Sequence, residues 1–97
     1  MREEKMNQGL KAKRKAKRYD VLKVMRRLRG PQTITVERMR DELRRYGVEI
    51  IASNSEDALR TRMYKDPAIK KVAPNKFRRN PQTFEKFYQK AKRLARV

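Results

Sequence analysis

The feature that most constrains the fold is an abrupt change at Pro67 in the spacing of apolar residues along the sequence. The residues before it, 54–65, are predicted to form a helix that ends there, because a residue preceding proline disfavours the helical conformation. The S-x-x-E motif at 53–56 has the spacing of a capping box at the start of this helix. Leu59 and Met63 lie four positions apart and share one face, which we expect to be buried.

Beyond the proline, the sequence has the pattern of two short strands. Segments 69–72 and 76–79 flank a proline–asparagine pair at 74–75. Proline presets φ and asparagine tolerates positive φ, so the pair suits the centre of a tight turn. We therefore expect a small basic hairpin directly after the helix, with Val72 and Phe77 paired across the turn.

Three further helices are predicted from apolar stripes and from the residues that punctuate them. The first covers 19–29, and a β-prone piece, 32–34, follows it. The second covers 36–46, with Thr35 as its N-cap. The third covers 81–97, and its stripe either packs across the core or pairs with its own copy in a homodimer. The residues expected to be buried in these helices are Val21, Leu22, Met25, Leu28, Val36, Met39, Leu43, Tyr46, Phe84, Phe87, Tyr88, Ala91, Leu94 and Ala95.

The run 59–67, followed by Ile69, Val72 and Phe77, resembles the third helix and wing of winged helix-turn-helix domains. The resemblance covers about 18–80. It implies a mainly α fold of the α+β class, in which the β-prone piece pairs with the hairpin as a three-stranded sheet.

The chain is accordingly predicted to have three parts. Residues 1–17 form a basic arm, 18–80 a winged-helix domain, and 81–97 a C-terminal helix.

Charge indicates the class of partner. The chain carries 29 basic and 11 acidic side chains, a net charge of +18, which attracts polyanions. Nucleic acid is favoured over an acidic membrane surface. Residues 32–52 are neutral while the segments on both sides are positive, so the second helix need not face phosphates.

Several function classes are disfavoured. The chain has no cysteine and no histidine, which removes thiolate chemistry, the usual general base and the commonest metal ligand. Adjacent carboxylates on a helix point about 100° apart, so none converges on a site. The three glycines are scattered, without a phosphate-binding loop. We expect no enzymatic activity, no cofactor and no metal. With no apolar run of about 18 residues and no apolar leader, we expect an intracellular location in cytoplasm or nucleoid.

The arm is predicted to contact phosphates without reading sequence. Its dense like charges repel one another, so alone it should be frayed. The alternative is a solubilising tail. The predicted contacts are Lys11, Lys13, Arg14, Lys15, Lys17 and Arg18.

Helix 54–65 would present its polar face to a major groove, where Asn and Arg can contact adenine and guanine in bidentate fashion. The alternative for Asn54 and Ser55 is that they only cap the helix; otherwise Ser55 bonds a phosphate. The predicted contacts are Asn54, Ser55, Asp57, Arg60, Thr61, Arg62 and Lys65.

The resemblance implies that the hairpin touches a minor groove or the backbone, with Asn75 and Lys76 at its tip. The alternative is a solvated hairpin whose lysines prevent aggregation. The predicted contacts are Lys70, Lys71, Asn75, Lys76, Arg78 and Arg79.

Aromatic residues could also stack on bases of a single strand. We expect Phe77 and Tyr88 to be core instead, while Tyr46 and Tyr64, near helix ends, stay open between the two interpretations.

The favoured function is double-stranded DNA binding by a small transcriptional regulator or architectural protein. Its small size, without an effector domain, is compatible with an origin in a virus, phage or plasmid. The alternatives are an RNA-binding or ribosome-associated protein, and a protein-interaction module.

Overall fold

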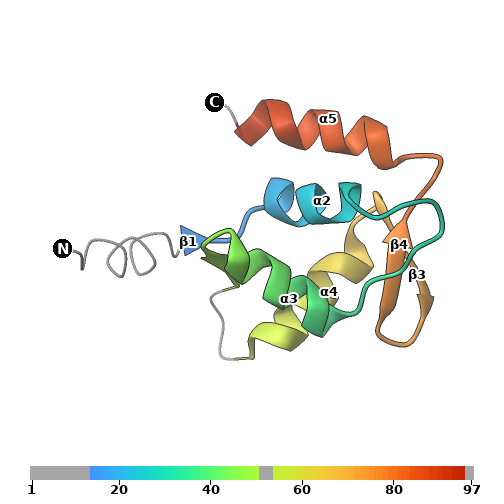
Figure 1. Ribbon diagram of the computed structural model, residues 1–97. Helices are drawn as coiled ribbons and strands as arrows, with labels where there is room; N and C mark the ends of the chain where they lie inside the picture. Colours follow the sequence, from blue (N-terminus) through green and yellow to red (C-terminus); the bar gives the residue numbers. More distant parts are fainter. Residues whose placement is uncertain (1–13, 51–53, 96–97) are drawn as a thin grey trace.

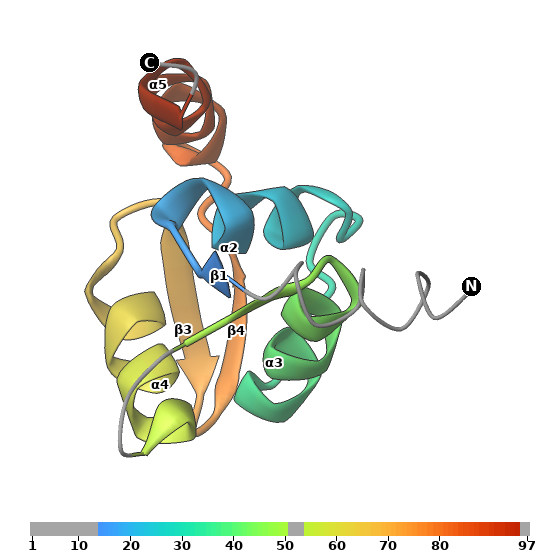
Figure 2. The ribbon, with the colours of Figure 1, turned by 90° about the vertical axis from the view of Figure 1, so that its left-hand side faces the viewer.

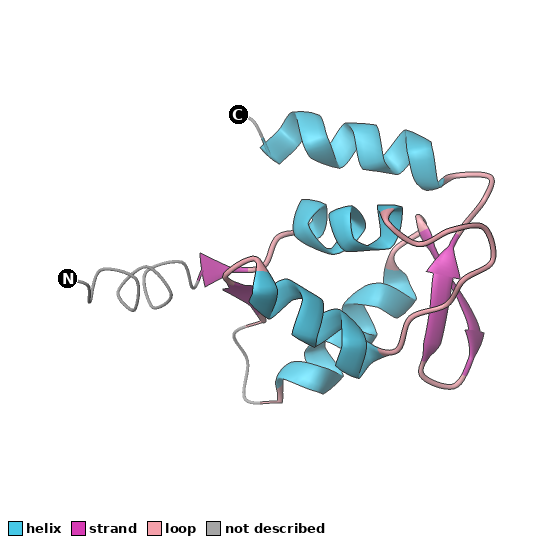
Figure 3. Ribbon diagram, in the orientation of Figure 1, coloured by secondary structure: helices cyan, strands magenta, loops and turns pink. Residues whose placement is uncertain are grey.

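Three helices pack around one core, and a fourth lies on top of them (Figure 1). The computed structural model describes residues 14–50 and 54–95. Within them, helices are combined with short strands, so the predicted α+β class is confirmed (Figure 3). The elements are β1 (Arg14–Lys15), α2 (Arg18–Arg26), α3 (Val36–Arg45), β2 (Val48–Glu49), α4 (Ser55–Lys65), β3 (Ile69–Ala73), β4 (Lys76–Arg79) and α5 (Phe84–Ala95).

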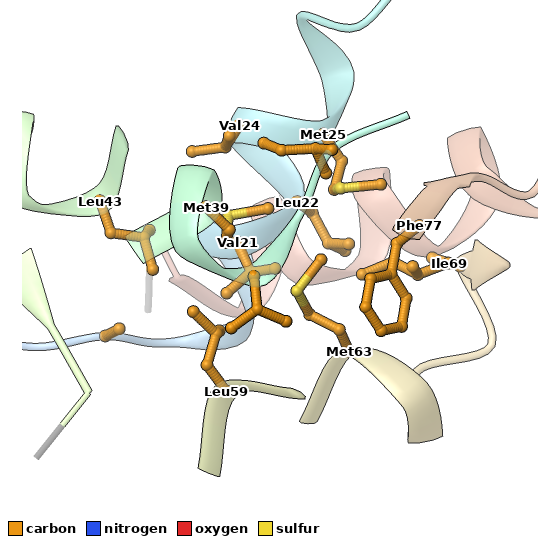
Figure 4. Packing of buried hydrophobic residues seen from close by; sticks show 14 of the residues in the cluster. Val21, Leu22, Val24, Met25, Met39, Leu43, Leu59, Met63, Ile69 and Phe77 are labelled. Carbon is orange, nitrogen blue, oxygen red and sulfur yellow. The ribbon is translucent and has the colours of Figure 1, made fainter. Parts of the chain in front are cut away.

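The core is formed where α2, α3, α4 and the hairpin of β3 and β4 meet (Figure 4). Leu59 and Met63 are fully buried, as predicted, and Phe77 reaches them from β4. Burying one such side chain contributes about 1.5–3 kcal/mol, so these contacts fix the face that α4 turns inward. The predicted burial of Val21, Leu22, Met25, Val36, Met39 and Leu43 is confirmed as well.

The helices are arranged in layers. α2 lies between α5 on one side and the pair α3 and α4 on the other (Figures 1 and 2). The stripe of α5 meets α2 through Tyr88, whose ring lies 5.7 Å from that of Tyr19 and 4.4 Å from the Arg26 guanidinium. The stripe is therefore covered within the chain. Its distal member Leu94 was predicted to be buried, which is wrong, because it lies beyond this contact and is 64% exposed.

The hairpin forms as predicted, with a different register. Asn75 takes φ +62° in the turn. Phe77 lies opposite Lys71, and the ladder is irregular between Lys71 and Ala73. Val72 therefore has no place opposite Phe77 and is 43% exposed, so its predicted pairing is wrong.

The expected third strand is reduced to one residue. Ile34 N–H donates to Phe77 O at 2.8 Å, and Phe77 N–H donates to Ile34 O at 3.0 Å. This single antiparallel bridge joins the loop before α3 to the hairpin.

Two helix starts differ from prediction. Asn54, rather than the residue before it, is the N-cap of α4, and its Oδ1 accepts from Asp57 N–H at 3.1 Å. The Glu56 carboxylate pairs with Arg40, and Ser53, with the predicted capping box, lies outside the described residues. In α5 the turns at 81–83 precede the helix, whose first residue is Phe84 rather than Pro81.

Other helix ends are closer to prediction. Thr35 caps α3, as expected, by accepting from Arg38 N–H at 3.1 Å. Tyr46 was predicted to be buried, which is wrong: α3 ends before it and it is 46% exposed. α2 ends at Arg26, three residues earlier than predicted, and Leu28 is only partly buried.

Part of the predicted arm belongs to the fold. β1 pairs in parallel with β2, with Arg14 opposite Val48. Ala16 is buried, and Arg18 starts α2. A two-residue strand has no periodicity that a sequence could show. None of the helices in 14–50 and 54–95 is long and apolar enough to cross a membrane.

Candidate nucleic-acid interface

The outward face of α4 is set by its buried face. Because Leu59 and Met63 point inward, Thr61, Tyr64 and Lys65 are turned into solvent. Tyr64 is 64% exposed. This face offers an aromatic ring and an ammonium group in its C-terminal half.

Four of the predicted contacts of α4 are bonded within the chain: Asn54, Asp57, Arg60 and Arg62. The Asn54 side chain caps the helix, and Ser55, half-buried, is its first residue. Asp57 and Arg60 form an ion pair with each other, three positions apart. Arg62 Nη1 donates to Ala16 O at 2.9 Å. Base contacts by these side chains stay a prediction. To make them, the side chains would have to break the bonds that they form within the chain.

The tip of the hairpin is attached to α3. Asn75 Oδ1 accepts from Val36 N–H at 3.3 Å, and its Nδ2 donates to Glu37 Oε1 at 2.8 Å. The second bond, foremost, holds the pKa of the Glu37 carboxyl below its ordinary value. Asn75 thus braces the turn against a helix start rather than projecting as a free tip.

The remaining hairpin cations divide by exposure. Lys70, Lys71 and Lys76 are exposed. Arg78 and Arg79 are half-buried, with the Arg79 guanidinium 5.7 Å from the Phe84 ring. The hairpin therefore presents lysines outward and keeps its arginines against the body.

The described part of the arm is tied to the body. Lys17 is the N-cap of α2, and its N–H donates to Asp20 Oδ2 at 2.8 Å. Arg18 pairs with the buried carboxylate of Asp66. Lys15 is exposed. The predicted contacts Lys11 and Lys13 lie outside the described residues.

A groove lies beside the C-terminal end of α4. About 630 Å³ in volume, it is bounded by the end of that helix, β3 and the turn at 80–83. It brings together Tyr64, Lys65, Lys70 and Lys71, which come from two elements. Lys71 Nζ lies 5.3 Å from the centre of the Tyr64 ring.

Whether Tyr64 is core or is exposed for stacking was left undecided from the sequence, although its spacing from Leu59 and Met63 predicts exposure. It lies one position after Met63 and five after Leu59, so it is turned about 100° and 140° from them at 100° per residue. Those angles exclude it from the buried stripe. The closeness of Lys70 and Lys71 to it could not be predicted, because it depends on how the hairpin packs on α4.

The described residues 14–50 and 54–95 contain no group of three or more carboxylates that could hold a metal ion. Comparison with protein-family models, with curated proteins and with solved structures finds no match.

Proposed function

We propose that this chain binds double-stranded DNA as a winged-helix domain, with α4 in a major groove and the hairpin on the flanking minor groove or backbone. Its role would be that of a small regulator or architectural protein. The observation that carries the proposal is the exposed, basic edge where α4 meets β3, which includes Lys65, Lys70 and Lys71.

The order of the elements supports the winged-helix assignment. A helix, a one-residue strand at Ile34, two further helices and a two-stranded hairpin follow one another, and Ile34 pairs with β4. The sequence resemblance implied a similar order with a full third strand, of which Ile34 forms a single bridge; β1 and β2 are additional to that order. α4 directly precedes the hairpin and packs against it, so both can face one duplex.

The charge of that edge supports an anionic partner. In α4 and directly after it, Glu56 pairs with Arg40, Asp57 with Arg60 and Asp66 with Arg18, so all three carboxylates are compensated within the fold. The exposed lysines are available to phosphates. Each phosphate neutralised on duplex DNA contributes about −0.9 to the slope of log K against log[salt].

The test is the salt dependence of duplex binding in two charge-matched variants. Replacing Lys65, Lys70 and Lys71 by Gln should make the slope shallower by about 2.7, three contacts at about 0.9 each. The matched control replaces Lys86, Lys90 and Arg93 by Gln on the exposed side of α5, on the far side of α2. It removes the same charge and should change the slope by less than about 1.

Two results would overturn the proposal. Equal changes in both variants would mean that net charge alone attracts DNA. Displacement of the duplex DNA by equimolar duplex RNA would favour the RNA-binding alternative, because an A-form major groove is too narrow for α4.

A further inference from the structure

We propose that the groove beside Tyr64 binds one unpaired nucleotide at the end or interruption of a duplex, with the base on the Tyr64 ring and its phosphate on the neighbouring lysines. This rests on the proposed function in one respect: the duplex itself would lie against α4.

The Tyr64 ring is placed for stacking rather than for packing. Leu59 and Met63 supply the inward face of α4, and Tyr64 is 64% exposed. Single exposed aromatics are ordinary on protein surfaces, so exposure alone decides nothing. What distinguishes Tyr64 is that its ring forms a wall of a groove that also holds three lysines.

The opposite wall of the groove is fixed by hydrogen bonds. Asn80 N–H donates to Ala68 O at 3.0 Å, and Thr83 Oγ1 donates to Pro67 O at 2.8 Å. These bonds tie the turn at 80–83 to the end of α4. The volume of about 630 Å³ lies within the range of about 300–1,000 Å³ of small-ligand sites, so the groove has the size that a nucleotide requires.

The lining of the groove is cationic because its one carboxylate is buried and hydrogen-bonded within the fold. Asp66 is 8% exposed and accepts three hydrogen bonds, two from Arg18 and one from Ala68 N–H. Among the lining residues this leaves the ammonium groups of Lys65, Lys70 and Lys71 without a carboxylate.

Lys71 reaches the ring from β3. It lies opposite Phe77, so its side chain leaves the strand on the face that α4 covers. Its ammonium contacts the Tyr64 ring in a cation–π geometry at 5.3 Å. A phosphate bound by the Lys71 ammonium would lie no more than one nucleotide along the strand from a base stacked on the Tyr64 ring.

The experiment uses the full chain and two probes: a blunt duplex, and the same duplex with one unpaired 2-aminopurine nucleotide at an end. Wild type should bind the second probe more tightly and change its fluorescence. Tyr64→Ala should weaken binding of the second probe by about 5- to 150-fold more than it weakens binding of the blunt duplex, the range for one lost stack. Tyr64→Phe keeps the ring and should keep the preference.

Tyr46→Ala is the matched control. Tyr46 is also exposed, at 46%, and its ring also has cations nearby, Lys23 and Arg27 at 5.8 Å, but it lies at the end of α3 and does not line the groove. This variant should behave as wild type. Circular dichroism verifies that both alanine variants are folded, which their exposure predicts.

Three outcomes overturn the groove assignment: no preference of wild type for the unpaired probe, equal loss on both probes in Tyr64→Ala, or displacement of the probe by an equal concentration of free deoxyadenosine monophosphate. Blunt-duplex binding by wild type reports separately on the proposed function. If wild type does not bind the blunt duplex but the unpaired probe gives a signal that depends on Tyr64, the proposal of duplex binding is refuted and the groove assignment is retained.

Discussion

The ion pair between Arg18 and Asp66 gives the sharpest stability prediction. Arg18 Nε donates to Oδ2 at 2.9 Å, and its Nη2 donates to Oδ1 at 2.8 Å. The pair joins the start of α2 to the residue after α4, and the guanidinium lies 5.1 Å from the Phe87 ring of α5. Arg18→Met would keep the apolar stem and remove both donors.

The expected cost follows from the burial of the two partners. Removing one member of a buried pair costs about 3–5 kcal/mol, because the other charge stays behind without compensation. The Asp66 side chain is 6% exposed, whereas that of Arg18 is 36% exposed, so water screens part of the interaction. We therefore expect Arg18→Met to lower the free energy of unfolding by about 2–3 kcal/mol.

Asp66→Asn should lower the free energy of unfolding by less than Arg18→Met does, and the effects of the two substitutions should be coupled. The amide keeps an oxygen for Ala68 N–H, which donates to Oδ1 at 3.0 Å, but turns its own donors toward Arg18. The double variant contains no buried charge. It should cost at least about 1 kcal/mol less than the sum of the single variants.

Urea unfolding of the four proteins at one pH measures these energies, with an unchanged m-value as the check that only stability differs. Arg93→Met, an exposed arginine on α5, is the control and should stay within about 0.5 kcal/mol of wild type. Additivity of the two substitutions, or a cost of Arg18→Met below about 0.5 kcal/mol, would refute the reasoning.

Two further predictions concern the turn and the core. Asn75→Gly keeps the positive φ but deletes the bond to Glu37, so the pKa of that carboxyl should rise toward its ordinary 4.5, as an NMR titration would record. The folded-state pKa of Glu37 is lowered, so the stability that this carboxyl contributes is present above 4.5 and is lost as pH falls through the folded value. The variant should lose the part of that dependence that comes from the Asn75 bond. Leu59→Ala, at a fully buried site, should lower the free energy of unfolding by about 2–5 kcal/mol, whereas Leu94→Ala, 64% exposed, should change it by less than about 0.5. Equal unfolding midpoints for the two leucine variants would contradict the packing described.

The α+β class and the inward faces of the helices could be predicted because each depends on local periodicity. Leu59 with Met63, and Met39 with Leu43, fall on one side of a helix whatever surrounds them. The turn at 74–75 was predictable for a similar reason, since proline and asparagine have the φ values that the turn requires.

What the sequence did not show depends on contacts between distant segments. The pairing of β1 with β2 joins residues more than thirty positions apart and leaves no pattern in either. The exposure of Val72 follows from an irregular register beside Phe77, which no strand period predicts. The bonds from Asn75 to the start of α3 required the hairpin and that helix to be placed first.

The site was only partly predictable because a cation's role depends on its nearest acceptor. Arg18, Arg60 and Arg62 were predicted, like Lys70 and Lys76, to contact nucleic acid, since in a sequence all are positive charges. In the structure those three arginines bond carboxylates or a carbonyl of the same chain.

This division between arginine and lysine bears on the role within the proposed function. Arginine's planar fork matches the paired oxygens of carboxylates and phosphates, whereas lysine's strongly hydrated ammonium acts as a point charge. The structure follows that chemistry: Arg40 and Arg62 connect helices to their neighbours, while Lys65, Lys70 and Lys76 are exposed. Base discrimination depends chiefly on bidentate side chains, each worth about 1–3 kcal/mol, and point charges on phosphates supply affinity without it. An interface composed mainly of lysines therefore favours the architectural role over that of a sequence-reading regulator.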